Sequence, residues 1–182
     1  MKKIIAISGS LRKNSYNTHL LGAAQALVPE SFDIEIAPLN TIPLYNYDVE
    51  VNEGIPSAVV ALKDKISAAD ALLLSTPEYN NGIPGVMKNA IDWLSRPPQD
   101  IPKIFHNKTL GLIGAGESRF GTVLAQTAWL SILRFLNTRL YCEKSLYISN
   151  VSNVFNENGE LIDVKIKQLL REYLDGFCKF IE

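Results

Sequence analysis

The sequence is poor in the residues that build disulfide frameworks, metal sites and acid–base centres. Only Cys142 and Cys178 occur in 182 residues. They lie far apart and have no partners at metal-ligand spacing, so neither a disulfide scaffold nor a zinc site is predicted. The two histidines, His19 and His106, have no recognisable catalytic partner, and we expect both to have packing or surface roles.

An excess of charge of one sign and long apolar runs are also missing. Eighteen basic and nineteen acidic residues leave a net charge of −1, which gives no electrostatic reason to expect a nucleic acid or a membrane surface as partner. No apolar run approaches the roughly 20 residues of a membrane-spanning helix. The apolar start at Met1–Ile7 stops at Ser8, short of a secretory signal core. We therefore expect a cytoplasmic protein.

Familiar nucleotide-binding and hydrolase motifs are absent as well. No G-x-x-x-x-G-K-[ST] segment occurs, which disfavours a nucleoside triphosphatase. Gly114-x-Gly116 has Arg119 where the third glycine of a dinucleotide-binding fingerprint belongs, which disfavours a Rossmann dehydrogenase. No G-x-S-x-G elbow marks a serine hydrolase.

What is present is an alternation of short apolar runs with segments of helical period. This pattern predicts an α/β fold, a parallel sheet covered by helices on both faces, as one domain over residues 1–182. Strands are expected at Lys3–Ser8, Phe32–Ala37, Ala71–Leu74 and Thr109–Ile113, with a fifth within Arg139–Ile148. Helices are expected over Ser15–Val28, Pro56–Ala69, around Met87–Leu94, over Val123–Leu136 and over Val164–Ile181, and Pro38–Ile55 is predicted to be a loop near the ligand.

If the five strands are ordered 2-1-3-4-5, the loops after strands one, three and four leave neighbouring carboxyl ends, where open parallel sheets bind ligands. The first of these loops runs into a helix, so unpaired backbone N–H groups and the helix dipole favour a phosphate there. Further donors are offered by the side chains of Ser10, Arg12, Asn14, Ser15 and Asn17. The competing interpretation is that Asn14 or Ser15 only caps the helix.

The loops after strands three and four, residues 75–85 and 114–121, offer backbone amides and glycines that let a flat group approach the main chain. Tyr79 and Asn80 belong to the first of them. A phosphorylated ligand with a flat ring, bound without evident acid–base groups, fits flavin mononucleotide (FMN), which carries its own redox chemistry.

Three motifs resemble those of the NADPH-dependent FMN reductase family, which includes chromate and quinone reductases and azoreductases. They are G-S-L-R-K-N-S-Y-N at Gly9–Asn17, T-P-E-Y-N at Thr76–Asn80 and P-G-V-M-K-N-A-I-D-W-L-S-R at Pro84–Arg96. The resemblance implies a flavodoxin-like three-layer sandwich with FMN bound at a homodimer or homotetramer. It also implies two-electron transfer from NADPH or NADH through flavin N5 to quinones, free flavin, azo dyes or metal oxyanions such as chromate.

A flavodoxin-type electron carrier is the alternative function. Such carriers use a strongly acidic face to dock on their partners, and the net charge of −1 argues against one.

The resemblance also assigns the cofactor site, with no catalytic side chain and no metal ligand. Glu78 is expected to contribute its backbone N–H. The ring of Tyr79 either packs on the flavin, which its loop position favours, or covers the core. Serines are common in similar chains where this one has Ala115 and Gly116, so we expect backbone contacts there, with Ser118 and Arg119 as compensating side chains. The full expected set is Ser10, Arg12, Asn14, Ser15, Tyr16, Asn17, Pro77, Glu78, Tyr79, Asn80, Gly114, Gly116 and Glu117.

Three further residues have expected roles outside that set. Arg119 either binds the phosphate of the nicotinamide nucleotide or is a solvated loop charge. The helix in Pro84–Arg96 is placed at the dimer interface by the resemblance, with Trp93 as its anchor. Arg96 is expected near the cofactor edge or the partner subunit.

Overall fold

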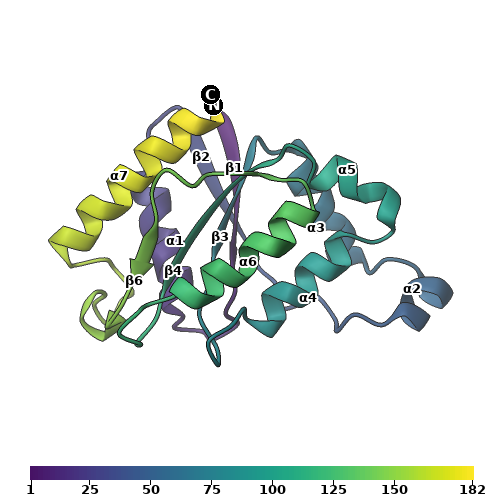
Figure 1. Cartoon of the computed structure of the whole chain (residues 1–182), viewed down its shortest axis with the longest axis horizontal. Helices are drawn as coiled ribbons and strands as arrows, with labels where there is room; N and C mark the ends of the chain where they lie inside the picture. The colour runs from purple at the N-terminus through teal and green to yellow at the C-terminus, as the bar shows by residue number, and fades with distance from the viewer.

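The computed structural model describes residues 1–182, and a parallel sheet lies at its centre (Figure 1). The strand order is β2-β1-β3-β4-β5, which confirms the predicted order, and a sixth strand, β6, also pairs with β4. All pairings are parallel. The strands are β1 Lys2–Ser8, β2 Phe32–Ala37, β3 Ala71–Ser75, β4 Thr109–Ala115, β5 Arg139–Leu140 and β6 Leu146–Ile148.

The predicted fifth strand is divided in two, so that part of the prediction is wrong. β5 pairs with Thr109 and Leu110, and β6 pairs with the end of β4, while residues 141–145 leave the sheet. The division has a packing cause. Tyr141 is buried and turns its ring towards Tyr173 of the last helix, at 5.3 Å between centroids. The four residues after it, Cys-Glu-Lys-Ser, offer little apolar surface for a sheet face.

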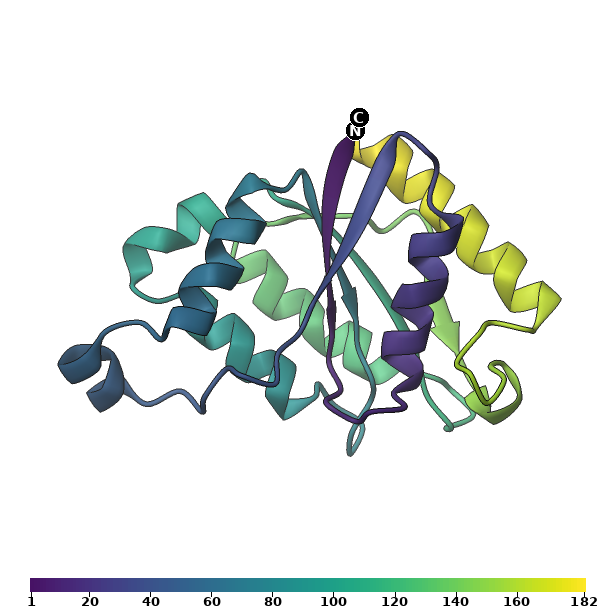
Figure 2. The same ribbon diagram turned by 180° about the vertical axis from the view of Figure 1, so that it is seen from behind.

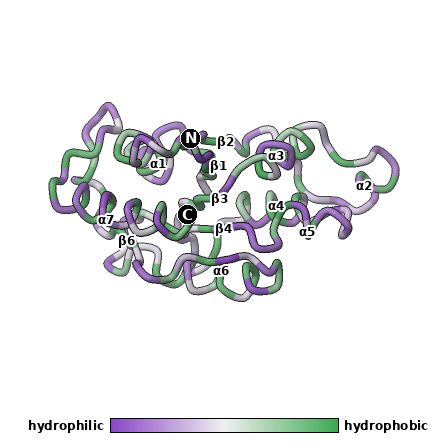
Figure 3. Tube along the Cα trace, turned by 90° about the horizontal axis from the view of Figure 1, so that it is seen from above, coloured by the Kyte–Doolittle hydropathy of each residue, from purple (hydrophilic) through white to green (hydrophobic).

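Helices cover both faces of the sheet, so the α/β three-layer prediction is confirmed (Figures 1 and 2). Seen from above, the strands form a row between α1 and α7 on one side and α3, α4 and α6 on the other (Figure 3). Each side has its own apolar core. The helices are α1 Tyr16–Leu27, α2 Tyr47–Glu53, α3 Ser57–Ala68, α4 Gly85–Leu94, α5 Ile101–Ile104, α6 Val123–Phe135 and α7 Val164–Ile181, with 3₁₀ turns at Pro98–Asp100 and Val151–Asn153.

The connection at residues 38–55, predicted to be a loop, contains α2. Asn46 caps this helix by accepting a hydrogen bond from the Asp48 N–H, at 2.9 Å. No residue of α2 is buried, and the helix stands away from the body of the protein (Figure 1). It is held there by an ion pair between Glu50 and Arg96. Since α2 has no buried apolar stripe, the sequence carries no helical period that would reveal it.

Trp93 is buried, so its expected role as an interface anchor is wrong. Its exposed fraction is 0%, and its indole Nε1 donates to the carbonyl of Pro43, at 2.9 Å. The edge of the Tyr45 ring packs on it, at 4.9 Å between centroids. Trp93 therefore holds residues 43–45 against α4 within one chain.

Two helices expose large apolar side chains. In α7, Leu169 is 40% exposed although Leu170 beside it is buried. In α6, the exposed side chains include Leu124, Leu130 and Phe135, the last at 80%. No helix of the structure combines the length and apolarity needed to cross a bilayer.

Candidate functional site

The loop after β1 leads into α1 through a capped helix start. Ser15 is the N-cap, and its hydroxyl oxygen accepts a hydrogen bond from the Thr18 N–H, at 3.3 Å. The capping role weighed for Ser15 is therefore real, and Asn14 does not share it. The N–H groups of Tyr16 and Asn17, at the first two helical positions, donate to no acceptor in the chain. They remain available to an anion at the positive end of the helix dipole.

The side chain of Asn17 joins three elements through its Oδ1 and one N–H of its Nδ2. Asn17 is 3% exposed. Its Nδ2 donates to the Ala115 carbonyl, and its Oδ1 accepts from the Ala115 N–H and the Ser75 hydroxyl, at 2.9, 3.1 and 2.9 Å. Nδ2 keeps one further N–H, so the prediction that the Asn17 amide donates to a ligand stays a prediction. The three bonds of Asn17 hold the start of α1 against the ends of β3 and β4.

The loop after β3 is fixed from inside and from α6. The Thr76 hydroxyl accepts from the indole N–H of Trp129, at 3.1 Å, and donates to the Pro77 carbonyl. Tyr79 and Gly82 exchange two backbone hydrogen bonds and form a small hairpin. Its tip, Asn80 and Asn81, has the left-handed backbone that asparagine tolerates.

The Glu78 carboxylate is engaged in a structural hydrogen bond, so we assign it no role in proton transfer. Its carboxylate accepts a hydrogen bond from the Ala125 N–H in the first turn of α6, at 3.0 Å. An anion is favoured at this end of a helix. The backbone N–H groups of Glu78 and Asn80 make no bond within the chain, so the loop keeps donors free while the carboxylate is engaged.

The loop after β4 packs against its neighbours through Gly114. A Cβ on Gly114 would collide with the Thr122 side chain and the Thr76 carbonyl. Gly116 has more room, and its N–H donates to the Ile148 carbonyl, at 2.9 Å. Packing at the end of β4 thus requires a glycine at position 114. Further along this loop, the backbone N–H groups of Glu117 and Ser118 make no hydrogen bond within the chain.

These three loops enclose one cavity of about 450 Å³. All the predicted site residues line it except Asn14, Asn80 and Gly114. Asn14 faces a neighbouring hollow beside Phe155, and Gly114 lies within β4. Ala115 and Ser118, expected as a backbone contact and as a compensating side chain, also line the cavity. No histidine or cysteine lines this cavity, so it holds no cysteine or histidine nucleophile or base.

Arg12 stands at the mouth of the cavity without an anionic partner. Its guanidinium lies over the ring of Tyr16, 4.8 Å from the centroid, and it makes no ion pair in the chain. Behind Tyr16, burial and the charge of Arg12 lower the pKa of His19. The cationic group facing this cavity is therefore free to bind an anion.

Arg96 and Arg119, for each of which the sequence left two roles, lie outside the cavity. Arg96 donates through Nε to both carboxylate oxygens of Glu50, at 3.1 and 2.9 Å. Glu50 has a lowered pKa, first because of the hydrogen bond from Arg96. Arg96 thus holds α2 rather than a cofactor edge. Arg119 is exposed on the loop after β4.

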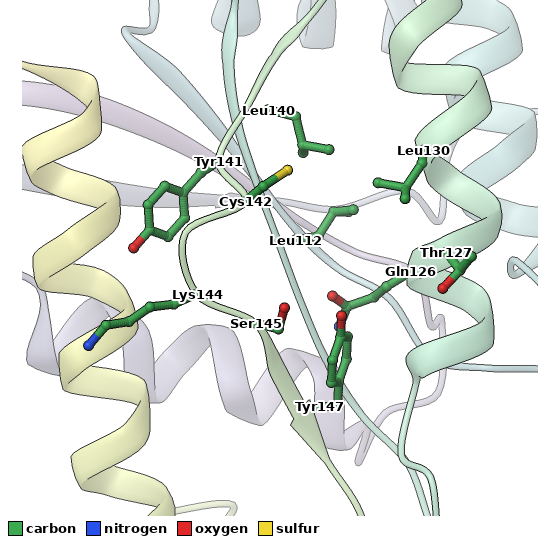
Figure 4. A pocket seen from close by; sticks show the side chains of 10 residues that line it. All are labelled: Leu112, Gln126, Thr127, Leu130, Leu140, Tyr141, Cys142, Lys144, Ser145 and Tyr147. Atoms are coloured by element: carbon green, nitrogen blue, oxygen red, sulfur yellow. The ribbon is translucent and has the colours of Figure 1, made fainter.

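A second, smaller cavity of about 200 Å³ lies where the chain leaves the sheet between β5 and β6 (Figure 4). Cys142 and Leu112 point into it, facing Leu130 of α6, while Tyr141 points the other way, towards α7. None of the predicted site residues lines it. No group of three His, Cys, Asp or Glu side chains in the structure is arranged to hold a metal ion.

Comparison with known proteins adds three findings. The family model described as NADPH-dependent FMN reductase matches residues 2–152. An NAD(P)H-dependent FMN reductase of Pseudomonas aeruginosa is 44% identical over 174 residues, 96% of this chain and 92% of that protein, and a quinone reductase of Escherichia coli is 34% identical over 99% and 95%. The solved structure of FerB, a flavoenzyme NAD(P)H:(acceptor) oxidoreductase from Paracoccus denitrificans, superposes with a TM-score of 0.89 at 31% identity, over 100% of this chain and 97% of that one.

Proposed function

Because this chain belongs to the NADPH-dependent FMN reductase family, we propose that it is an FMN-dependent NAD(P)H oxidoreductase that reduces quinones. The observation that carries the proposal is the single cavity that joins the loops after β1, β3 and β4. Free flavin, azo compounds and metal oxyanions such as chromate are further acceptors in this proposal, because a cavity open to solvent admits many flat or small electron-poor molecules.

We place the FMN phosphate at the N-terminus of α1. The donors suit a phosphate: the N–H groups of Tyr16 and Asn17, the hydroxyls of Ser10 and Ser15, and the unpaired guanidinium of Arg12 all border the cavity. Backbone N–H groups at a helix start and an arginine fork are the usual protein ligands of a phosphomonoester.

We place the flavin ring between the loops after β3 and β4. The unpaired N–H groups of Glu78, Glu117 and Ser118 suit the carbonyl edge of an isoalloxazine, and Tyr79, half exposed beside them, offers an aromatic face. When bound, FMN takes two electrons from a nicotinamide nucleotide and passes them to the acceptor. The chain's own part is to bind and orient, which agrees with a cavity that lacks histidine and cysteine.

The direct test is reduction under anaerobic conditions. The purified protein is loaded with FMN and mixed with NADPH or with NADH, and the visible flavin absorbance is followed before and after addition of a benzoquinone. We expect the absorbance to fall with at least one nucleotide and to return with the quinone. Absorbance unchanged by both nucleotides would overturn the oxidoreductase assignment.

The phosphate site has its own test. Arg12→Ala combined with Ser15→Ala is expected to release FMN during gel filtration, whereas Arg119→Ala, on an exposed loop position, serves as the matched arginine control. Normal FMN retention in the double variant would remove the phosphate assignment.

We propose that the protein forms a homodimer or homotetramer through α4, the helix that the resemblance places at the interface, and through the exposed face of α6 beside it. The outer face of α6 carries Leu124, Thr127, Ala128, Leu130, Ser131 and Phe135, with no charge before Arg134. An isolated surface helix normally presents charged residues to water. Phe135→Asp is expected to lower the mass in light scattering to that of one 20.2 kDa chain, while Leu169→Asp, on α7, leaves it unchanged. A monomeric wild-type protein would refute the interface.

We place the protein in the cytoplasm, where nicotinamide nucleotides are available. The two unpaired thiols, Cys142 and Cys178, support this location, because oxidising compartments favour disulfides.

A further inference from the structure

The ring of Tyr16 contacts two other side chains. The guanidinium carbon of Arg12 lies over the ring, 4.8 Å from its centroid. The Phe155 ring is stacked with it, with centroids 6.2 Å apart and planes 18° from parallel. Tyr16 therefore joins the exposed arginine of the first loop to an aromatic residue that is 139 positions later in the chain.

Phe155 is itself held firmly. It is 7% exposed, and it bridges to Leu161 across a short turn. Inside that turn the Asn156 side chain accepts the N–H groups of Asn158 and Glu160, at 3.0 and 2.9 Å. The segment packs against the first turns of α1 (Figure 2), where the edge of the His19 ring meets Phe155 with centroids 5.7 Å apart.

Nothing else in the chain fixes the direction of Arg12. Its side chain makes no ion pair and no hydrogen bond, so the Tyr16 ring is the contact that restricts it. A guanidinium that is stacked in advance loses less rotamer freedom when it binds a phosphate. His19, whose pKa is lowered by burial and by Arg12, adds little positive charge behind it at neutral pH.

We propose that Phe155 is a positioning residue for the cofactor phosphate: through Tyr16 it orients the Arg12 guanidinium towards the N-terminus of α1. The inference rests on the proposed FMN site. Phe155 lies outside residues 2–152, the part of the chain matched by the family model, so its role comes from the contacts of this structure alone.

The test separates the phosphate from the flavin ring. Full-length protein freed of cofactor is titrated with FMN and with riboflavin, which lacks the phosphate, and flavin fluorescence is followed. Phe155→Leu is expected to weaken FMN binding about three- to tenfold, the usual range for losing one aromatic contact, and to change riboflavin binding less than about twofold. Phe155→Tyr, which keeps the ring, is expected to retain FMN affinity.

Two controls complete the design. Phe180→Leu removes a ring from a similar arginine–phenylalanine contact, with Arg139 at 4.7 Å, and is expected to leave both affinities unchanged. In an Arg12→Ala background, Phe155→Leu is expected to have no further effect on FMN binding.

Equal weakening of FMN and riboflavin, or an effect that persists without Arg12, would overturn the positioning role. If Phe155→Leu does not fold, the same titrations are made with Tyr16→Leu, which removes the stacked ring, and with Tyr16→Phe, which keeps it. Wild-type protein that binds neither flavin refutes the proposed FMN site itself, which is a separate outcome.

Discussion

Asn17 and Ala115 exchange two hydrogen bonds, from Asn17 Nδ2 to the Ala115 carbonyl and from the Ala115 N–H to Asn17 Oδ1, although 98 positions separate them. An asparagine side chain here pairs with backbone as a neighbouring strand would. The pair closes the gap between α1 and the end of β4, and it sets the width of the cavity between the first and third loops.

Asn17→Ala is expected to destabilise the protein by about 3 kcal/mol, because a buried N–H, a carbonyl and a hydroxyl lose their partner. Urea unfolding followed by circular dichroism measures the change. Asn14→Ala, an exposed asparagine three positions earlier, is the matched control and should cost less than about 0.5 kcal/mol. Equal losses in the two variants would contradict the structural role.

Gly114→Ala is expected to cost about 1 to 3 kcal/mol, because the added methyl group meets the Thr122 side chain and the Thr76 carbonyl, and the latter belongs to rigid backbone. Gly116→Ala is the paired variant. Its nearest neighbour would be the Gly121 carbonyl at 3.4 Å, so its unfolding midpoint should shift far less. Equal unfolding midpoints for Gly114→Ala and Gly116→Ala would contradict the packing role of Gly114.

Glu78→Ala is expected to destabilise α6 by about 1 kcal/mol, through loss of the hydrogen bond to the Ala125 N–H and of a charge at the helix start. Glu78→Gln keeps an acceptor oxygen and should recover part of this loss. Thermal unfolding of both variants tests whether Glu78→Gln is more stable than Glu78→Ala. A glutamine variant less stable than the alanine variant would show that the carboxylate is not a cap.

The two thiols are expected to differ sharply in reactivity. Burial, with the charges of Asp175 and Glu182, raises the pKa of Cys178 from 9.0 to about 12, whereas Cys142 is exposed. At pH 8 a disulfide reagent should modify one thiol per chain quickly and the other at least about a hundredfold more slowly until the chain unfolds. Cys142→Ser identifies the fast thiol, and two fast thiols in the wild-type protein, or a fast thiol left in Cys142→Ser, would refute the burial of Cys178.

The raised pKa of Cys178 also predicts how the stability of the folded protein changes at alkaline pH. Cys178 keeps its proton in the folded protein between pH 9 and about 12, while the unfolded chain releases it. The folded state then binds more protons, so the contribution of Cys178 to stability is present below pH 9 and is lost as the pH rises towards 12.

The strands and the ligand end of the sheet could be predicted because they depend on local patterns, whereas the strand order agreed with the flavodoxin-like fold that the resemblance implied. Ile4–Ile7 and Leu72–Leu74 are apolar runs that only a buried strand explains, and the polar loops that follow mark the carboxyl ends. The break between β5 and β6 could not be predicted, because it depends on where Tyr141 finds aromatic partners in α7.

Within the site, the residue types near the phosphate loop were predictable, but the use of each side chain was not. Asn17 and Glu78 have the chemistry of ligand-binding residues, yet their side chains bond to backbone from other elements. Trp93 illustrates the same limit, because an aromatic residue on a helix suits an interface or a core equally until its neighbours are known. Tertiary contacts between distant segments decide such cases.

The helix α2 buries no residue of its own, and its attachment to the body includes the Glu50 carboxylate held by Arg96 and the Asn89 side chain, which bonds to both Pro43 and Tyr45. We therefore expect its amide protons to exchange earlier than those of the sheet, and a protease to cut this connection before it cuts the sheet. Because Arg96 lowers the pKa of Glu50, the Glu50–Arg96 contact persists to a more acidic pH than an ordinary glutamate would allow.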